Sequence, residues 1–408
     1  MSSSTFRDSA GATLDSFFYP TSGPGGSTLG TAPGHAEEHR RYADALTFLE
    51  QQGQGKTIVN VMGAGAKGDG VTDDSAAINT AIANAGPGAV VVFPPPPVAY
   101  GIGANPITVA NDGVTLTGLG VGNTKHAGLS SGTYVQALSP LAEMVLVTGS
   151  FVGITHMALD ANTLAARNVF VQQQSCTIRD VTMIRATQVG LDSLGSASTP
   201  AGNGNLLVME QCVIVTQPGG TNMPVLNCWD VDWVVSDCRL IGGAKNLMTH
   251  SGGGIWNNCH FTGSGTASAN VELWAGHQFS NCYVDSYSGV GGIRHNADST
   301  ITGNQPTQQS TWSNTKFYQN TAGITAAPCV VEASTVSSVT MMNSIVIPHG
   351  GNFSYFVDAP NAYTVVVGMV ALQQTGPVPL TALYGSTAAG PSFSFGCLLG
   401  TTKQANIL

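Results

Sequence analysis

Two aspartates occupy alternate positions in the segment Trp229-Asp230-Val231-Asp232-Trp233. In a strand, alternate side chains point the same way, and their backbones lie roughly 6.6 Å apart. Carboxyl gaps of about 5–5.5 Å suit glycoside hydrolysis with retention, and gaps of about 6.5–9.5 Å suit inversion. If Val235 points inward, Trp233 does too, and both aspartates point outward. Asp230 and Asp232 are therefore the candidate catalytic residues, one as acid and one as base or nucleophile. The alternative is two solvated surface acids.

Aromatic, acidic and imidazole side chains recur further along the chain, where a repeating fold brings them beside this pair. Counting back from Cys259 places His250 near the level of Asp230. The candidate glycan-binding residues are Trp274, Glu272, His250, His295 and Arg294. Aromatic rings with a few polar groups along one face are typical of a sugar-binding site. The alternative is a set of unrelated polar residues on the exterior.

A polysaccharide lyase would need calcium-binding carboxylates from neighbouring coils and a basic residue. Asp160 and Asp180 are candidates for adjacency, with Arg179 and Arg185 nearby. A third acid is missing from this set. The sequence therefore favours hydrolysis over elimination, should the protein be an enzyme.

We expect no metal site and no cofactor. The chain has no CxxC pair, and His35 and His39 lack both an HExxH pattern and a third ligand. The glycine pattern at 118–122 has no strand–helix–strand context for a nucleotide. Ser251 beside His250 lacks a placed third group for a catalytic triad.

An irregular repeat after residue 150 supplies the elements that would position these residues. In each copy a polar residue precedes a small or apolar residue, and β-forming residues follow. The second positions lie 31, 26, 21, 23, 33 and 29 residues apart. They are Val181, Cys212, Cys238, Cys259, Cys282, Thr315 and Ser344. A period in the twenties with variable insertions predicts a solenoid with one coil per repeat.

The repeat also accounts for half of the eight cysteines. Equivalent residues of successive coils stack about 4.8 Å apart. We therefore expect Cys212, Cys238, Cys259 and Cys282 to form one internal row of apolar groups, and Asp237, Asn258 and Asn281 to form a polar ladder at the adjoining turn. The alternatives are disulfides or a metal site, which synthesis in a reducing compartment does not favour.

Composition narrows the function classes. Charged residues make up 9% of the 408 residues and the net charge is −9, with no basic patch, so nucleic acid is not an expected partner. No run of about 18 apolar residues occurs, so we expect no membrane insertion. Residues 1–7 contain no apolar run, so we expect no signal peptide.

We divide the chain into three parts. Residues 1–54 are predicted to be an extended arm followed by a helix over 36–52. Residues 55–345 form the solenoid. Residues 346–408 are predicted to leave it as a terminal β element, because 363–372 is apolar on both faces and Pro377, Pro379 and Pro391 interrupt a continuing coil.

Residues 58–100 resemble the entry segment of the pectate-lyase-like β-helix family, which includes many phage tail spikes. The resemblance lies in Ile58-Val59-Asn60-Val61 and in Gly65-Ala66-Lys67-Gly68-Asp69-Gly70-Val71-Thr72-Asp73-Asp74-Ser75-Ala76-Ala77-Ile78. It implies an all-β fold, a right-handed parallel β-helix whose first coil is capped by a helix. Asp73 or Asp74 can cap that helix, and Ile78, Ala81 and Ile82 would face the core.

The first 50 residues resemble the arm and helix that join phage minor tail proteins to the virion, chiefly in Gly34-His35-Ala36-Glu37-Glu38-His39. The two resemblances imply a homotrimeric tail-spike or tail-fibre protein of a phage virion, assembled in the bacterial cytoplasm. Its expected partners are other tail proteins, through the N-terminal region, and the host's cell-surface polysaccharide. The alternatives are a depolymerase on the same fold, or a secreted cellular enzyme that degrades polysaccharide.

Overall fold

The computed structural model describes residues 57–403, except 122–131, 174, 194–205, 217–222, 230–231, 251–252, 264–269, 274–275, 286–291, 296–308, 319–328, 332–337, 348–354, 359–362, 369, 372–381, 386–391, 396–397 and 400–401. All of the described residues belong to one compact unit, Lys56–Leu408. The arm and helix predicted for residues 1–54 lie outside the described residues.

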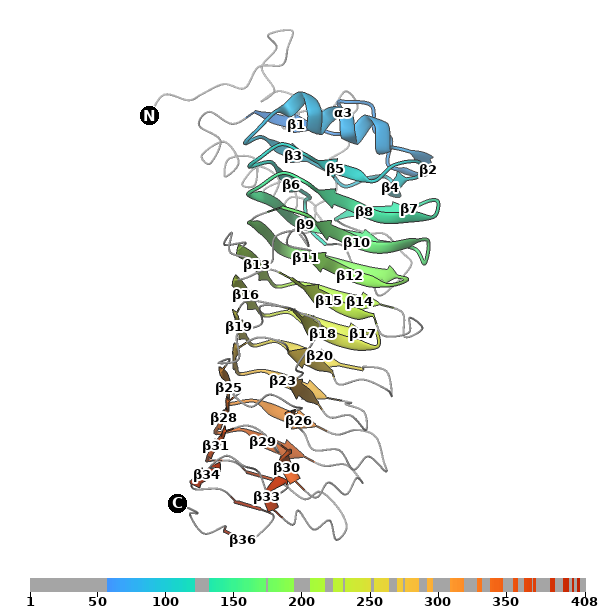
Figure 1. The fold of residues 1–408 in the computed structure, drawn as a ribbon. Helices are drawn as coiled ribbons and strands as arrows, with labels where there is room; N and C mark the ends of the chain where they lie inside the picture. The colour runs from blue at the N-terminus through green and yellow to red at the C-terminus, as the bar shows by residue number, and fades with distance from the viewer. Residues whose placement is uncertain are drawn as a thin grey trace, which may run out of the picture. The chain divides into compact units, whose positions relative to one another are not determined.

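Each coil contributes strands to three rows, which we call rows A, B and C (Figure 1). Row A contains β1 (Ile58–Asn60), β3 (Val90–Val92), β6 (Thr115–Thr117), the first halves of β9 (Val152–Asp160) and β11 (Cys176–Ala186), β13 (Leu206–Glu210), β16 (Asp232–Ser236), β19 (Gly253–Asn257), β22 (His277–Ser280), β25 (Gln309–Ser313), β28 (Ser338–Met342), β31 (Tyr363–Val367) and β34 (Ser392–Phe395). 

Row B contains β2 (Asp69–Asp73), β4 (Ala99–Ile102), β7 (Thr133–Ala137), the second halves of β9 and β11, β14 (Val213–Thr216), β17 (Arg239–Gly242), β20 (His260–Thr262), β23 (Tyr283–Asp285), β26 (Lys316–Tyr318), β29 (Ile345–Ile347), β32 (Val370–Ala371) and β35 (Leu398–Leu399). Row C contains β5 (Ile107–Val109), β8 (Leu141–Val147), β10 (Ala165–Val171), β12 (Val189–Ser193), β15 (Pro224–Cys228), β18 (Lys245–Thr249), β21 (Val271–Leu273), β24 (Ile293–His295), β27 (Cys329–Val331), β30 (Tyr355–Asp358) and β33 (Ala382–Gly385).

Rows A and B, together with the final strand β36, form one 25-stranded sheet, and row C forms an 11-stranded sheet. Neighbouring strands within each row are parallel, as in β13 with β16 and β15 with β18. Parallel strands joined by crossovers follow a right-handed path. The fold is therefore the right-handed parallel β-helix that the sequence predicts.

The helix α3 (Ser75–Ala85) covers the first coil, as expected. Ile78, Ala81 and Ile82 are at most 2% exposed and face the core. The preceding aspartates hold the turn: Asp73 accepts hydrogen bonds from the N–H groups of Ser75, Gly103 and Ala104, at 3.0, 3.0 and 2.8 Å. Asp74 occupies the cap position but uses its carboxylate on Lys67 and Gly68 instead. These acids have structural roles.

The bend between rows A and B is a single residue in the left-handed region, repeated in coil after coil. Its members have φ between 49° and 56° and are His156, Asp180, Gln211, Asp237, Asn258, Asn281, Asn314 and Asn343. Asn and Asp tolerate this conformation better than other L-residues. The predicted ladder is formed in part: Asn258 Nδ2 donates to Asp237 Oδ1 at 2.6 Å and Asn314 Nδ2 to Asn281 Oδ1 at 3.4 Å, whereas Asn281 Nδ2 donates to Asn257 Oδ1 at 3.1 Å.

Replacing Asn281 by valine should lower the free energy of unfolding by about 1–3 kcal/mol, because a β-branched residue is strained at φ 55°. Asn281→Gly is the matched control, since glycine adopts this conformation without strain. Equilibrium denaturation of both variants measures the difference. Equal stability of the two would contradict a conformational role for the ladder position.

The interior confirms the register of the repeat. Val213, Arg239, His260 and Tyr283 are partners on successive coils, so the preceding cysteines 212, 238, 259 and 282 form one row. The backbone N–H of Cys212 lies 3.4 Å from Cys238 Sγ, and all four thiols are free and at most 1% exposed. The predicted packing role is thus confirmed for these four residues.

An aromatic column fills the core beneath row A. Trp233 and Trp256 stack with ring centroids 6.3 Å apart, Trp256 and Phe279 at 5.7 Å, and Phe279 and Trp312 at 3.6 Å. Each is at most 1% exposed. Trp256, Phe279 and Trp312 are register partners on successive coils. Trp233 lies two residues before Val235, the register partner of Trp256.

Two histidines are also buried in this part of the core. His277 Nδ1 accepts the Trp256 Nε1–H at 3.3 Å, and its Nε2 lies 3.2 Å from Thr249 Oγ1. Burial lowers the pKa of His277 to about 3 and that of His295 to about 4, from 6.5. Both imidazoles are therefore neutral in the folded protein at pH 7.

Stability should fall as pH falls from 6.5 toward about 4, because the unfolded state then binds more protons than the folded state. The maximum slope is about 1.4 kcal/mol per pH unit for each histidine. Melting temperatures measured between pH 7 and 5 test this expectation. A His295→Leu variant should show a weaker pH dependence, and an unchanged dependence would be evidence against the assignment.

The predicted boundary at residue 345 is wrong. Row A continues from β28 to β31 and β34, row B from β29 to β32 and β35, and row C from β27 to β30 and β33, all in parallel pairing. Only the last pair, β35 with β36 (Thr402–Lys403), is antiparallel among the described strands. The described strands after 345 therefore continue the coils, and the terminal β element is reduced to this final pair.

Candidate functional site

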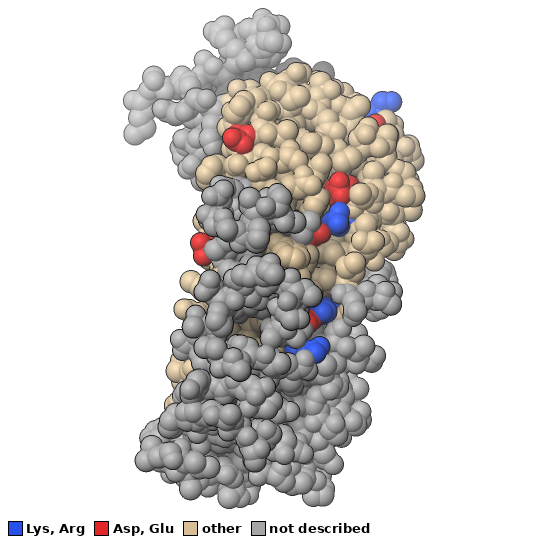
Figure 2. All heavy atoms as spheres, viewed as in Figure 1, with Lys and Arg blue, Asp and Glu red and all other residues tan. Residues whose placement is uncertain are grey.

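The outer face of row C carries a line of polar side chains on otherwise apolar strands. Strand alternation turns Leu191, Leu226 and Leu247 inward, so the residues that follow them point outward. The outward positions in register on successive coils are Phe170, Asp192, Asn227, Met248, Glu272 and Arg294. Figure 2 shows this side of the molecule, where basic and acidic side chains lie next to one another.

Arg167 links two carboxylates at the upper end of this face. Its Nη1 lies 3.3 Å from Glu143 Oε2, and its Nε lies 2.8 Å from Asp192 Oδ2. The Arg167 guanidinium also lies 4.5 Å from the centre of the Phe170 ring. Burial raises the pKa of Asp192, while hydrogen bonds from Asn227 and the charge of Arg167 oppose the rise.

A hydrogen-bonded chain continues from Asp192 to His250. Asn227 Nδ2 donates to Asp192 Oδ1 at 2.9 Å, so Asn227 Oδ1 is the atom that faces His250 Nε2, also at 2.9 Å. Because that amide oxygen only accepts, His250 must carry a proton on Nε2. The chain thus fixes both the amide orientation and the tautomer.

An aromatic pair lies at the His250 end of this hydrogen-bonded series, at the corner where row C leads into row A. The rings of Trp229 and His250 stack with centroids 3.7 Å apart and planes at 5°. The backbone N–H of Trp229 donates to the backbone oxygen of Ser193 at 2.8 Å. The backbone N–H of His250 donates to the backbone oxygen of Cys228, also at 2.8 Å. The backbone therefore holds both rings at equivalent positions of neighbouring coils.

Lys245, on the strand that precedes His250, forms an ion pair with Glu272 on the next coil, and both side chains are less than 10% exposed. Arg294 is the register partner of Glu272 on the next strand. A buried pair of this kind needs good geometry to offset the cost of desolvation. These charges therefore extend the polar line along row C without offering a lone acid to a substrate.

The structure brings together only some of the predicted site residues. Asp230 and Trp274 lie outside the described residues. Asp232 begins β16 with an exposed side chain, and Trp233 is 1% exposed, so this alternation is as predicted. His250 lies beside Trp229, one residue before Asp230, which agrees with the level counted from the repeat.

The other candidates divide between the two sides of the strands. Glu272 and Arg294 occupy outward positions, with Glu272 held by Lys245. His295 follows Arg294, is 7% exposed and is the register partner of the core residue Leu273. His295 therefore points into the solenoid, and its assignment to a glycan-binding face is wrong.

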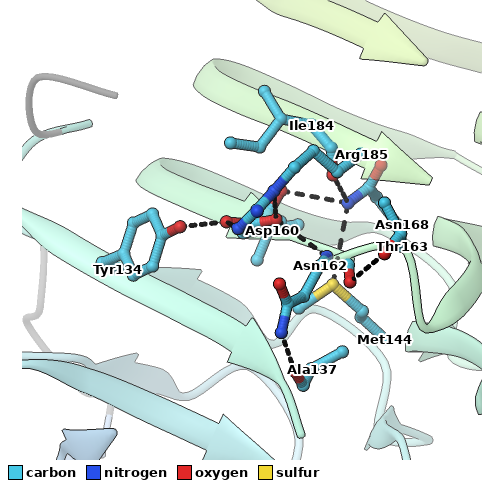
Figure 3. A network of polar contacts seen from close by, with 10 residues as sticks. Tyr134, Ala137, Met144, Asp160, Asn162, Thr163, Asn168, Ile184 and Arg185 are labelled. Carbon is cyan, nitrogen blue, oxygen red and sulfur yellow. Dashed lines mark hydrogen bonds and ion pairs between the residues drawn. The ribbon is translucent and has the colours of Figure 1, made fainter. Parts of the chain in front are cut away.

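The arrangement needed for a calcium-dependent lyase is absent from the described residues. Asp160 is opposite Ile184, whereas Asp180 is opposite His156 and lies 3.0 Å from its Nδ1, so the two acids are not adjacent. Figure 3 shows Asp160 between Tyr134 and Arg185, which both donate hydrogen bonds to it. In the part of the chain that the structure describes, no group of three or more His, Cys, Asp or Glu residues is placed to hold a metal.

Sequence reasoning missed the residues that form the best-connected network: Glu143, Arg167, Asp192, Asn227 and Trp229. The available signal was a polar residue directly after an inward leucine in Leu191-Asp192 and Leu226-Asn227. None of the helices in the described residues has the length and apolar character to cross a membrane.

Comparison with known proteins gives a family match and several solved structures of similar fold. The model of the family described as rhamnogalacturonase A/epimerase, pectate lyase-like, matches residues 58–345. No curated protein sequence matches the chain.

Three of the similar structures come from two viruses and a bacterium. ORF18 of Geobacillus virus E2 has 17% identity and a TM-score of 0.48, over 91% of this chain and 66% of that one. The A-module of the mannuronan C-5 epimerase AlgE6 of Azotobacter vinelandii has 16% identity and a TM-score of 0.49, over 84% and 100%. The pre-mature gene product 12 of bacteriophage phi29 has 15% identity and a TM-score of 0.49, over 90% and 60%. At these identities the likeness concerns the fold alone.

Proposed function

Because the chain belongs to the rhamnogalacturonase A/epimerase, pectate lyase-like family, we propose that it contacts a polysaccharide through the outer face of row C. The observation that carries this proposal is the chain of fixed donors and acceptors from Asp192 through Asn227 to His250, with Trp229 stacked at its end. Side chains held in this way are suited to recognising sugar hydroxyls, because their orientation is set before the ligand arrives.

We place this protein in the tail of a phage virion, as a spike that touches the host's cell-surface glycan. The resemblance of residues 1–50 to phage minor tail proteins supports that location, and those residues would join it to other tail proteins. The whole-protein role rests on this resemblance and on the family, and not on the similar solved structures.

Binding is favoured over cleavage by the state of the carboxylates on this face. Glu143 and Asp192 are paired with Arg167, and Glu272 is paired with Lys245. For Glu143 and Glu272, the neighbouring cation opposes the proton that a general acid must hold. Burial raises the pKa of Asp192, but one of its oxygens accepts from Asn227 and the other pairs with Arg167. Hydrolysis is the second candidate, because Asp232 is exposed and lies only three residues after Trp229.

The distinguishing experiment incubates the purified protein with polysaccharides extracted from a panel of bacterial cell surfaces. Retention of one polysaccharide by the immobilised protein, with no new reducing ends, is the expected result. New reducing ends would favour the hydrolase, and the Asp230→Asn/Asp232→Asn double variant should then lower turnover by orders of magnitude. Failure to retain any polysaccharide would contradict the proposal.

We also propose that the protein is a homotrimer whose copies meet through the outer face of row A. One line of outward positions in register there is uncharged: Thr115, Thr177, Val208, Val234, Ile255, Gln278 and Thr311. The same face also carries Asp232 and the ion pair of Arg179 with Glu210. Leu206, Val234 and Ile255 are 41%, 39% and 52% exposed. Identical copies can approach one another along this uncharged line without like-charge repulsion.

Light scattering at micromolar concentration should give the mass of three chains. An Ile255→Lys variant should shift the protein toward a smaller species, because it introduces like charges where copies are expected to meet. A monomeric mass for the unmodified protein would contradict the trimer.

A further inference from the structure

The outer face of row B carries two exposed cations that form no ion pair with the described residues. On the other described strands, Arg167, Arg179, Arg185 and Lys245 each lie within ion-pairing distance of a carboxylate. Arg239 on β17 and Lys316 on β26 are exposed and have no carboxylate partner among the described residues. In a chain with 14 basic and 23 acidic residues, two such cations on one face are a departure from the general pattern.

These two cations belong to one row of side chains. Arg239, His260, Tyr283 and Lys316 are direct partners on four successive coils. The two cations are therefore three coil steps apart, which is roughly 14 Å along the solenoid. A ligand that touches both must be extended along that direction.

The side chains between the cations are held in place by one another. The rings of His260 and Tyr283 stack with centroids 4.6 Å apart and planes at 15°. Lys316 Nζ lies 5.0 Å from the centre of the Tyr283 ring, and His260 Nε2 lies 2.8 Å from Asp285 Oδ2. The row thus has Arg239 at one end and Lys316 at the other, with the stacked rings of His260 and Tyr283 between them. The Asp285 carboxylate lies beside His260.

We propose that the outer face of β17, β20, β23 and β26 is a second binding site, which takes an acidic polysaccharide lying along the solenoid axis. Its carboxylate or phosphate groups would contact Arg239 and Lys316, and its hydroxyl groups would contact Asp285 and the ring edges of His260 and Tyr283. The proposal rests on the proposed function for the chemical class of the polymer, but it concerns another face of the molecule.

Charge argues for a glycan over a nucleic acid on this face. A nucleic acid needs many cations along its backbone, whereas this row offers Arg239 and Lys316 with Asp285 close by, on a chain of net charge −9. An acidic polysaccharide with widely spaced charges and many hydroxyls fits such a surface better.

Binding can be measured with four probes and the full-length protein: polygalacturonate, a polyglycerol phosphate, neutral dextran and duplex DNA. At low salt we expect one or both of the acidic glycan-type polymers to bind, with affinity that falls as salt is added, and dextran and DNA to bind weakly or not at all. The Arg239→Gln/Lys316→Gln double variant should bind the preferred polymer about tenfold more weakly, given the modest contribution of each exposed ion pair. Polygalacturonate and polyglycerol phosphate separate carboxylate from phosphate recognition.

Lys67→Gln is the matched control, because Lys67 is a cation outside the four strands of this row. It should leave the affinity unchanged. Trp229→Ala, which alters the face of row C, should leave a component of acidic-polymer binding that the Arg239→Gln/Lys316→Gln variant removes. No binding of either acidic polymer, binding unaffected by the double variant, or equal binding of DNA would overturn the inference. If Trp229→Ala alone abolished binding of the acidic polymer, this second site would be rejected while the proposed function would stand.

Discussion

Replacing Trp256 by alanine should lower the free energy of unfolding by about 3–5 kcal/mol, the range for removing a large buried aromatic side chain. Trp256 is 0% exposed and stacks between Trp233 and Phe279 in the aromatic column. Its loss would leave a cavity between coils and also remove the N–H that donates to His277. Equilibrium denaturation measures the change.

The neighbouring residue supplies the control. Ile255 lies next to Trp256 on β19 but points outward and is 52% exposed. Measured under conditions in which the protein is monomeric, Ile255→Ala should change stability by no more than about 0.5 kcal/mol, as is usual for surface substitutions. Similar losses for the two variants would mean that the assigned register of β19 is wrong.

Trp229→Ala should weaken binding of the contacted glycan by about 10–100-fold, the effect of losing a tryptophan at the centre of a binding surface. The substitution removes the ring that stacks on His250 at 3.7 Å. It thereby frees the His250 end of the hydrogen-bonded series that runs from Asp192 through Asn227. Titration calorimetry with the polysaccharide retained by the unmodified protein measures the change.

Two further variants locate that effect. Trp229→Phe keeps an aromatic ring and should retain much of the affinity. Tyr283→Ala removes an aromatic ring from row B and should leave the affinity for a ligand on row C unchanged. A Trp229→Ala variant with full affinity would exclude this corner of row C as the contact.

The fold could be predicted because the residue types that each coil requires recur at fixed positions of the repeat. A residue at φ near 50° favours Asn or Asp, and the next residue points inward and must be small, which gives Asn258-Cys259 and Asn281-Cys282. The boundary at 345 failed because strands of two to five residues continue the coils there, such as β31 and β32. Pro377, Pro379 and Pro391 lie outside the described residues.

The site was harder to predict because the segments between rows B, C and A vary in length. A register error of one residue moves a side chain to the opposite face of a strand, and His295 was misplaced in this way while Arg294 was not. Asp192 and Asn227 lie 35 residues apart in the sequence, so their contact follows only from the stacking of β12 on β15. The repeat marks rows A and B, but no comparable pattern marks row C.

A crystal structure with an oligosaccharide from the retained polysaccharide tests the central claim most directly. We expect the sugar to lie on the outer face of row C, with hydrogen bonds to Asn227 or Asp192 and a contact with Trp229. An oligosaccharide bound elsewhere, with this face unoccupied, would contradict the assignment of the glycan contact to row C.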